Sequence, residues 1–234
     1  MVRSRTDQHR QALRAEQGAG LRRRSVAIFF FSLVLFIVSA PFAQLLPEPA
    51  ALEGVFLGVV LLAGVFAVGG RRRTLVIAGS VTAVAVTARV LGYVWPGPAL
   101  HAIWLICAIL IFVIVAVHLL RFILQAPTVD LEVLAAGVAA YLLLGMLWMF
   151  LYLLVGFVEP QAFSLPQSAG GRTTLDPFTA FYYSFVTLTT MGYGDIVPVL
   201  PFARMLAVLE AVTGVLYLAV LVARLVTLYT ERRP

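Results

Sequence analysis

The chain has 234 residues, of which 62% are hydrophobic and only 12% are charged, and its formal net charge is +6. A soluble domain needs a more polar surface than this composition can supply, so a soluble protein is excluded. All basic residues are arginines, and most of them lie in the tail or at the ends of apolar runs, so we attribute the charge to membrane topology rather than to nucleic-acid binding.

The first half of the chain is predicted to be a four-helix membrane domain. Residues 1–24 form a polar, arginine-rich tail without the short apolar region and cleavage site of a secretory signal peptide. Four apolar runs follow within residues 25–128, and proline or glycine breaks close the first three. We predict membrane-spanning helices at about residues 25–46, 51–68, 75–95 and 99–124.

The second half, residues 129–234, has a different plan. Two further spans are predicted at residues 131–158 and 201–229. A polar loop, predicted at residues 159–175, follows the first of them. Asp176 and Pro177 then predict a helix start, because Asp caps helix N-termini and Pro favours the first helical position. This helix, residues 177–189, is too short to cross a bilayer, so we predict that it is re-entrant. The non-helical residues after it must line a cavity or be buried.

The placement of the arginines predicts the orientation. With six spans, most of them fall on one side of the membrane: Arg3, Arg5, Arg10, Arg14, Arg22, Arg23, Arg24, Arg71, Arg72, Arg73, Arg121, Arg224, Arg232 and Arg233. Because cytoplasmic loops carry an excess of positive charge, we predict a multi-pass protein of the cell (cytoplasmic) membrane with both termini in the cytoplasm. The arginines of the tail suit the anionic headgroups of membrane lipids.

Residues Thr190 to Gly194 have a pattern suited to binding a dehydrated potassium ion. Backbone carbonyls can replace the ion's lost water when successive residues point them at one axis. This requires unusual dihedral angles, including positive φ, which the alternate glycines Gly192 and Gly194 tolerate. The predicted K⁺ ligands are the carbonyls of Thr190, Met191, Gly192 and Tyr193, together with the Thr190 hydroxyl.

The stretch Thr189-Thr190-Met191-Gly192-Tyr193-Gly194-Asp195, which follows Phe181-Tyr182-Tyr183-Ser184-Phe185, resembles the filter of the potassium-channel family. The family filter reads Thr-Val-Gly-Tyr-Gly-Asp after an aromatic pore helix. The strong resemblance covers residues 131–229, and the six-span layout resembles bacterial six-transmembrane channels more loosely. The resemblance implies an all-α membrane protein with six transmembrane helices, a re-entrant pore helix and a filter loop, assembled as a tetramer that conducts potassium passively.

Two positions depart from the family pattern. Met191 stands where Val or Ile is usual, but its backbone carbonyl is the same, so we expect selectivity to survive. Val186 stands where some bacterial members have a glutamate that bonds the filter aspartate. Asp195 then needs another partner, and Tyr182 is the candidate. Thr189, Asp195 and Tyr182 are therefore predicted to support the filter.

A homotetramer is predicted because one filter strand cannot surround an ion.

Voltage-gated relatives carry an arginine ladder in the fourth span, whereas the run at residues 99–124 contains only Arg121, which we interpret as an interface anchor. We therefore predict weak or absent voltage dependence. The alternatives are a less selective monovalent cation channel, if Met191 loosens the filter, and a membrane signalling or assembly protein with a vestigial pore.

Charged and small residues within the spans are further candidates. Arg89 is predicted to pair with Glu53, because an intramembrane charge usually has a partner. Glu210 is either a vestibule charge or, as we favour, a buried partner near the pore helix. Gly214 is a candidate gating hinge, with close helix packing as an equal alternative. The stripe that could line the cavity is Leu206, Thr213, Tyr217 and Val220.

No group of residues predicts an enzyme. Cys107 is the sole cysteine, the histidines lack metal-ligand spacing, and we find neither a phosphate-binding loop nor a nucleophile–base pair. We therefore expect no cofactor beyond the permeant ion and no nucleic-acid partner. The few residues after Tyr229 leave no room for a soluble ligand-binding domain in this chain.

Overall fold

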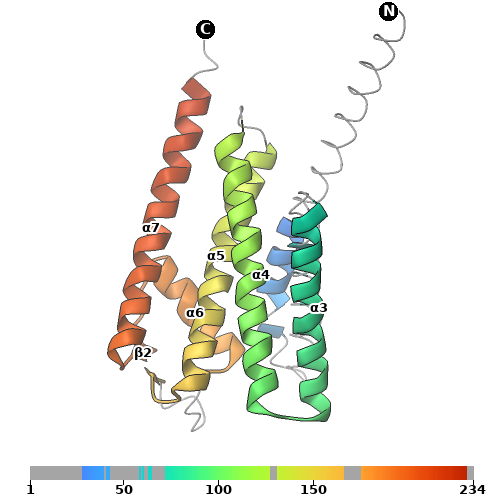
Figure 1. Ribbon diagram of the computed structural model, residues 1–234. Coiled ribbons are helices and arrows are strands. Elements are labelled where there is room, and N and C mark those ends of the chain that lie inside the picture. Colours follow the sequence, from blue (N-terminus) through green and yellow to red (C-terminus); the bar gives the residue numbers. More distant parts are fainter. Residues whose placement is uncertain are drawn as a thin grey trace, which may run out of the picture.

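Long apolar helices dominate the computed structural model, which describes residues 28–39, 41–42, 58, 60, 63–64, 72–126, 131–165 and 175–230. Within these residues, four helices are long and apolar enough to cross a membrane. They are α3 (Arg72–Val94), α4 (Pro98–Gln125), α5 (Leu131–Val158) and α7 (Pro201–Thr230). Their ends lie within three residues of the predicted boundaries, so these four helices are confirmed (Figure 1).

The first two predicted spans are described only in part. A shorter apolar helix over residues 28–39 lies inside the first predicted span. Scattered residues of the second span are described, and both Glu53 and the arginine-rich tail lie outside the described residues. The prediction of six spans thus stays a prediction for these two segments.

The short helix α6 (Pro177–Leu188) lies between α5 and α7 in the chain and packs against both. It begins at Pro177 because the Asp176 side chain caps it, accepting hydrogen bonds from the Thr179 backbone N–H at 3.0 Å and the Thr179 hydroxyl at 2.7 Å. It ends at Leu188, one residue earlier than predicted, with Thr189 as its C-cap. Its 12 residues are far fewer than the ~20 that span a bilayer.

A small strand pair ties the two loops around α6 together. β1 (Phe163–Ser164) pairs antiparallel with β2 (Val197–Pro198), and the Val199 N–H donates to the Ala162 carbonyl at 2.8 Å. The predicted polar loop over residues 159–175 thus contains a short strand near its start, which was not predicted. Two-residue strands are too short to show the alternating pattern from which strands are predicted.

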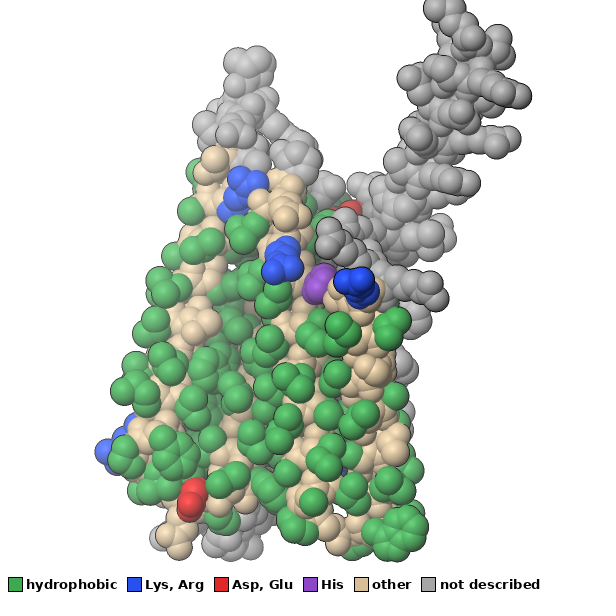
Figure 2. Space-filling model, viewed as in Figure 1, with side chains coloured by type: hydrophobic (Ala, Val, Ile, Leu, Met, Phe, Trp, Pro, Cys, Tyr) green, Lys and Arg blue, Asp and Glu red, His purple; other side chains and the backbone are tan. Residues whose placement is uncertain are grey.

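The helices pack as consecutive hairpins, with α3 against α4 and α4 against α5. One hydrophobic core joins α3, α4 and α5, and a second gathers behind α6, where aromatic rings from α5, α6 and β1 meet. On the face shown in Figure 2, hydrophobic side chains cover most of the middle, and charged side chains lie towards the two ends. α7 contributes least to these cores, and most of its large apolar side chains are exposed in the single chain.

Candidate functional site

The loop that follows α6 has the backbone conformation predicted for an oxygen-lined strand. Positive φ recurs at every second residue, with 57° at Thr190, 56° at Gly192 and 78° at Gly194. The two glycines adopt this conformation without steric cost, whereas Thr190 is the one non-glycine residue with positive φ in the described part of the chain. The sequence argument anticipated the glycines and missed Thr190, because threonine carries no signal for a left-handed conformation.

Backbone hydrogen bonds hold the start of the loop against the last turn of α6. The N–H groups of Met191 and Gly192 both donate to the Val186 carbonyl, at 2.9 and 3.2 Å. Among the described hydrogen bonds, none ends on the carbonyls of Thr190, Met191, Gly192 or Tyr193. The loop is also open to solvent in the single chain, with Tyr193 66% exposed. The carbonyls therefore have unfilled hydrogen-bonding capacity at the C-terminal, electronegative end of a helix.

The predicted supporting residues lie beside this loop. The Tyr182 ring stacks on the Tyr193 ring, with centroids 6.4 Å apart and planes 6° apart. The Tyr182 hydroxyl donates a hydrogen bond to the Asp195 carboxylate. Asp195 in turn accepts the Ile196 backbone N–H at 3.1 Å. α6, the loop and the turn after it are thus joined through Tyr182 and Asp195.

Glu210 lies directly behind α6 and is completely buried. Its carboxyl group meets the Tyr152 hydroxyl of α5 at 2.5 Å and the Ser184 hydroxyl of α6 at 2.6 Å. Ser184 Oγ also lies 2.7 Å from the Gly145 carbonyl oxygen. Glu210 is therefore the buried partner near the pore helix that we favoured, and it is not a vestibule charge. Nothing in the sequence marked Tyr152 or Ser184 as its partners.

The protons available in this cluster can be counted. Ser184 has one hydroxyl proton, but its oxygen lies within hydrogen-bond distance of both Glu210 and the Gly145 carbonyl. If Glu210 carries a proton, the Tyr152 hydroxyl donates to Glu210, Glu210 donates to Ser184, and Ser184 donates to Gly145, so every contact is satisfied. A protonated side chain also avoids the cost of burying an unpaired charge. The geometry thus favours a neutral carboxylic acid that joins α5, α6 and α7.

Gly214 lies where α7 crosses the end of α6. A Cβ atom here would overlap the Leu188 carbonyl oxygen and lie 2.9 Å from Leu188 Cδ1. α7 runs as one helix through this position. The structure thus shows the close packing that we weighed against a hinge, and hinge motion stays a prediction. The cavity-lining stripe was wrong for Tyr217, whose hydroxyl instead donates to the Gly137 carbonyl of α5 at 2.7 Å.

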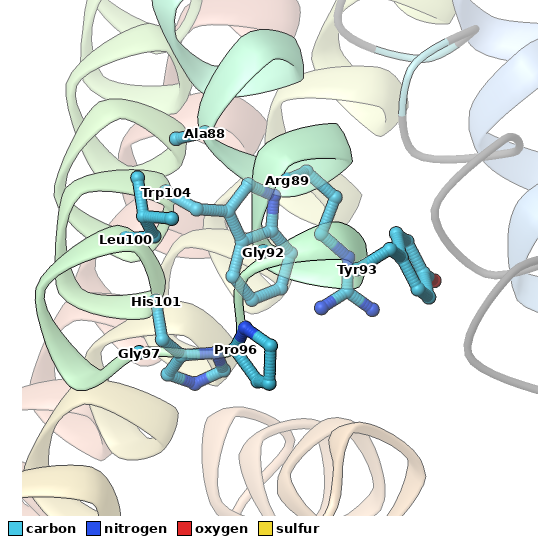
Figure 3. A pocket seen from close by; sticks show the side chains of 9 residues that line it. All are labelled: Ala88, Arg89, Gly92, Tyr93, Pro96, Gly97, Leu100, His101 and Trp104. Atoms are coloured by element: carbon cyan, nitrogen blue, oxygen red, sulfur yellow. The ribbon is translucent and has the colours of Figure 1, made fainter.

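Arg89 lies away from the loop, in a pocket of about 190 Å³ at the turn between α3 and α4. Its guanidinium carbon lies 4.6 Å from the centre of the Trp104 ring and 5.2 Å from that of Tyr93 (Figure 3). These cation–π contacts help to stabilise the charge within an apolar domain. Its predicted pairing with Glu53 stays a prediction, because Glu53 lies outside the described residues.

Within the described residues, no group of three or more His, Cys, Asp or Glu side chains could hold a metal ion. Any ion bound at the loop would therefore be held by backbone oxygens and the Thr190 hydroxyl.

Comparisons with known proteins point to the same part of the chain. Residues 132–231, which run from α5 to the end of α7, match a family model described as an ion channel. A segment of 86 residues is 40% identical to two-pore potassium channel 4 of Arabidopsis thaliana, covering 37% of this chain and 30% of that protein. A segment of 94 residues is 31% identical to two pore potassium channel a of Oryza sativa subsp. japonica, covering 40% of this chain and 26% of that protein.

The chain thus spans less than a third of the length of these relatives. No solved structure matches it. Residues 132–231 thus resemble an ion-channel module, and the described part of the chain contains four helices long and apolar enough to cross a membrane. The family model does not extend to the first four predicted spans.

Proposed function

We propose that the chain is one subunit of a potassium-selective channel in which four copies place their Thr190–Gly194 loops around a common axis. The observation that carries this proposal is the alternation of positive φ at Thr190, Gly192 and Gly194, directly after a helix too short to span the membrane. That alternation suits successive carbonyls facing one side, as ion coordination requires. The plant potassium channels that share part of the sequence support potassium as the ion.

The exposure of α7 supports assembly around an axis. Val208, Val215 and Val222 recur at intervals of seven residues on the side of α7 opposite Glu210, and each is more than half exposed in the single chain. α5 and α6 cover the other side. We assign the exposed side of α7 to the pore and to contacts between copies. A homotetramer is the simplest closed arrangement that provides both a central pore and contacts between copies.

The orientation and gating that we propose rest on charge placement. Arg73, Arg121 and Arg224 lie at the end of the bundle where α4 and α7 finish, and blue side chains gather at that end in Figure 2. We assign this end to the cytoplasm and the loops around α6 to the outside. Arg121 is the single arginine of α4 and is exposed, so we propose that voltage acts weakly, or not at all, through this helix.

The test is potassium flux into liposomes that contain the purified full chain. Gly192→Ala should abolish flux, because φ of 56° strains any residue with a Cβ, although nothing lies within 4 Å of that added atom. Gly79→Ala is the matched control, since it also adds a Cβ in open space but on ordinary helical backbone of α3. Wild-type flux from the Gly192 variant would overturn the proposal.

Two other outcomes identify the alternatives. Equal fluxes of sodium and potassium in the wild-type protein would indicate a less selective cation channel. An absence of flux from a correctly folded wild-type protein would favour the signalling or assembly role with a vestigial pore. Block of the flux by barium or a quaternary ammonium ion would support a potassium-type pore.

A further inference from the structure

A second cavity, separate from the loop, lies between α4 and α7. It has a volume of about 300 Å³, at the lower end of the range for pockets that bind small molecules in proteins. Its walls come from Leu120, Ile123 and Leu124 of α4 and from Leu216, Val220 and Leu221 of α7. Branched apolar side chains on both helices therefore face one shared space within the bilayer.

The polar residues at this cavity do not make it polar. The Thr213 hydroxyl donates to the Leu209 carbonyl at 2.5 Å, within its own helix. The Tyr217 hydroxyl donates to the Gly137 carbonyl of α5. Both hydroxyls are thus satisfied by backbone acceptors, and what these residues offer to the cavity is their apolar surface. Such a space suits a hydrocarbon chain better than water.

Arg224 closes one end of the cavity and is held in a fixed position. Its Nη2 atom donates to the Leu124 carbonyl at 3.2 Å and to the Ala126 carbonyl at 3.0 Å, which satisfies two acceptors at the C-terminus of α4. A guanidinium has five N–H donors, and these two bonds engage those of Nη2. Within the described part of the chain, its Nε has no hydrogen-bond partner. The Nε atom is buried, so what the cavity offers a ligand at this end is a pre-positioned positive charge.

We propose that this cavity binds one acyl chain of an anionic phospholipid from the cytoplasmic leaflet, with the lipid phosphate beside Arg224. The apolar walls suit the chain, and the guanidinium suits the phosphate through charge-assisted hydrogen bonds. The position also fits, because Arg224 lies less than two turns from the end of α7, where a headgroup would be found. The choice of leaflet rests on the orientation proposed above.

The bound lipid would join two parts of the chain. α4 belongs to the four-helix domain, whereas Leu216 to Arg224 belong to the half of α7 that leads away from the loop. The lipid would therefore occupy the seam between the described part of that domain and the ion-channel module. A change in its occupancy would alter how firmly these two parts are held together.

The test is native mass spectrometry of the detergent-solubilised full chain, titrated with dioleoyl phosphatidylglycerol or dioleoyl phosphatidylcholine. The wild-type protein should bind the anionic lipid roughly tenfold or more tightly, the factor expected from one charge-assisted hydrogen bond. Arg224→Gln should remove that preference. Leu216→Trp, which fills the cavity, should weaken binding of both lipids. Arg121→Gln is the matched control, because it removes an exposed arginine of α4 that does not line the cavity.

Several results would overturn the proposal. Equal losses from Arg224→Gln and Arg121→Gln would show diffuse surface attraction instead of a site. Wild-type binding by Leu216→Trp would show that no acyl chain enters the cavity. A changed oligomeric state of Leu216→Trp would show that another copy of the chain covers this face. Binding is read without ion flux, so these results are independent of whether the channel conducts.

Discussion

Replacing Glu210 tests whether a neutral carboxylic acid joins the three helices around the pore loop. Glu210→Gln keeps the shape of the side chain and its ability to accept one hydrogen bond and donate another. The amide oxygen can accept from Tyr152, while the amide nitrogen donates to Ser184. Glu210→Leu keeps most of the volume but leaves the buried Tyr152 hydroxyl without its acceptor. We therefore expect Gln to be tolerated and Leu to be destabilising.

The expected loss of stability in Glu210→Leu follows from the hydrogen bond that Tyr152 loses. A buried hydroxyl without a partner costs about 1–3 kcal/mol, which corresponds to a fall in Tm of roughly 2–12 °C for a chain of this size. Thermal unfolding of the full chain in detergent, followed by tryptophan fluorescence, measures this directly. Thr227→Val is the control, because it removes a hydroxyl that bonds only the Ala223 carbonyl of the same helix.

The comparison of the two Glu210 variants decides the protonation state. If the carboxyl is neutral, Gln should lie close to the wild type, and Leu well below it. If it is ionised, Gln should lose charge-assisted bonds worth about 1.5–3 kcal/mol each and unfold as early as Leu. That second result would refute the proton count that places a hydrogen between Glu210 and Ser184.

Substitutions at three further positions test other features. Gly214→Ala should destabilise the fold by about 1–3 kcal/mol, because the new Cβ overlaps the Leu188 carbonyl oxygen; an unchanged Tm would show that α7 moves away freely. Asp176→Ala should cost about 1 kcal/mol through loss of the helix cap, whereas Asp176→Asn should retain most stability in the same unfolding assay. Arg121→Gln should leave the voltage dependence of current in patched membranes unchanged, and a shift in that dependence would identify Arg121 as a sensing charge.

Much of the fold could be predicted because membrane helices and helix starts have strong local signals. Long apolar runs marked α3, α4, α5 and α7, since a span needs ~20 such residues. Asp176 and Pro177 marked the start of α6, because one supplies the cap and the other pre-sets the first φ angle. The spacing of Gly192 and Gly194 marked where positive φ would occur.

Features that depend on distant residues could not be predicted in this way. Tyr152 and Ser184 are far from Glu210 in sequence, and nothing local distinguishes them from other polar residues in apolar helices. Tyr217 was wrongly placed in the cavity because helical spacing alone does not show which face meets α5. Gly214 could be considered as a packing residue from the sequence. Its close contact with Leu188 becomes apparent only from the way in which α7 crosses the end of α6.

The central claim is potassium selectivity through the Thr190–Gly194 loop, and the reversal potential tests it most directly. Single channels of the purified full chain would be recorded in planar bilayers with potassium on one side and sodium on the other. The account predicts a current that reverses near the potassium equilibrium potential, and loss of that current in Gly192→Ala but not in Gly79→Ala. A reversal near zero, or unchanged selectivity in the Gly192 variant, would contradict it.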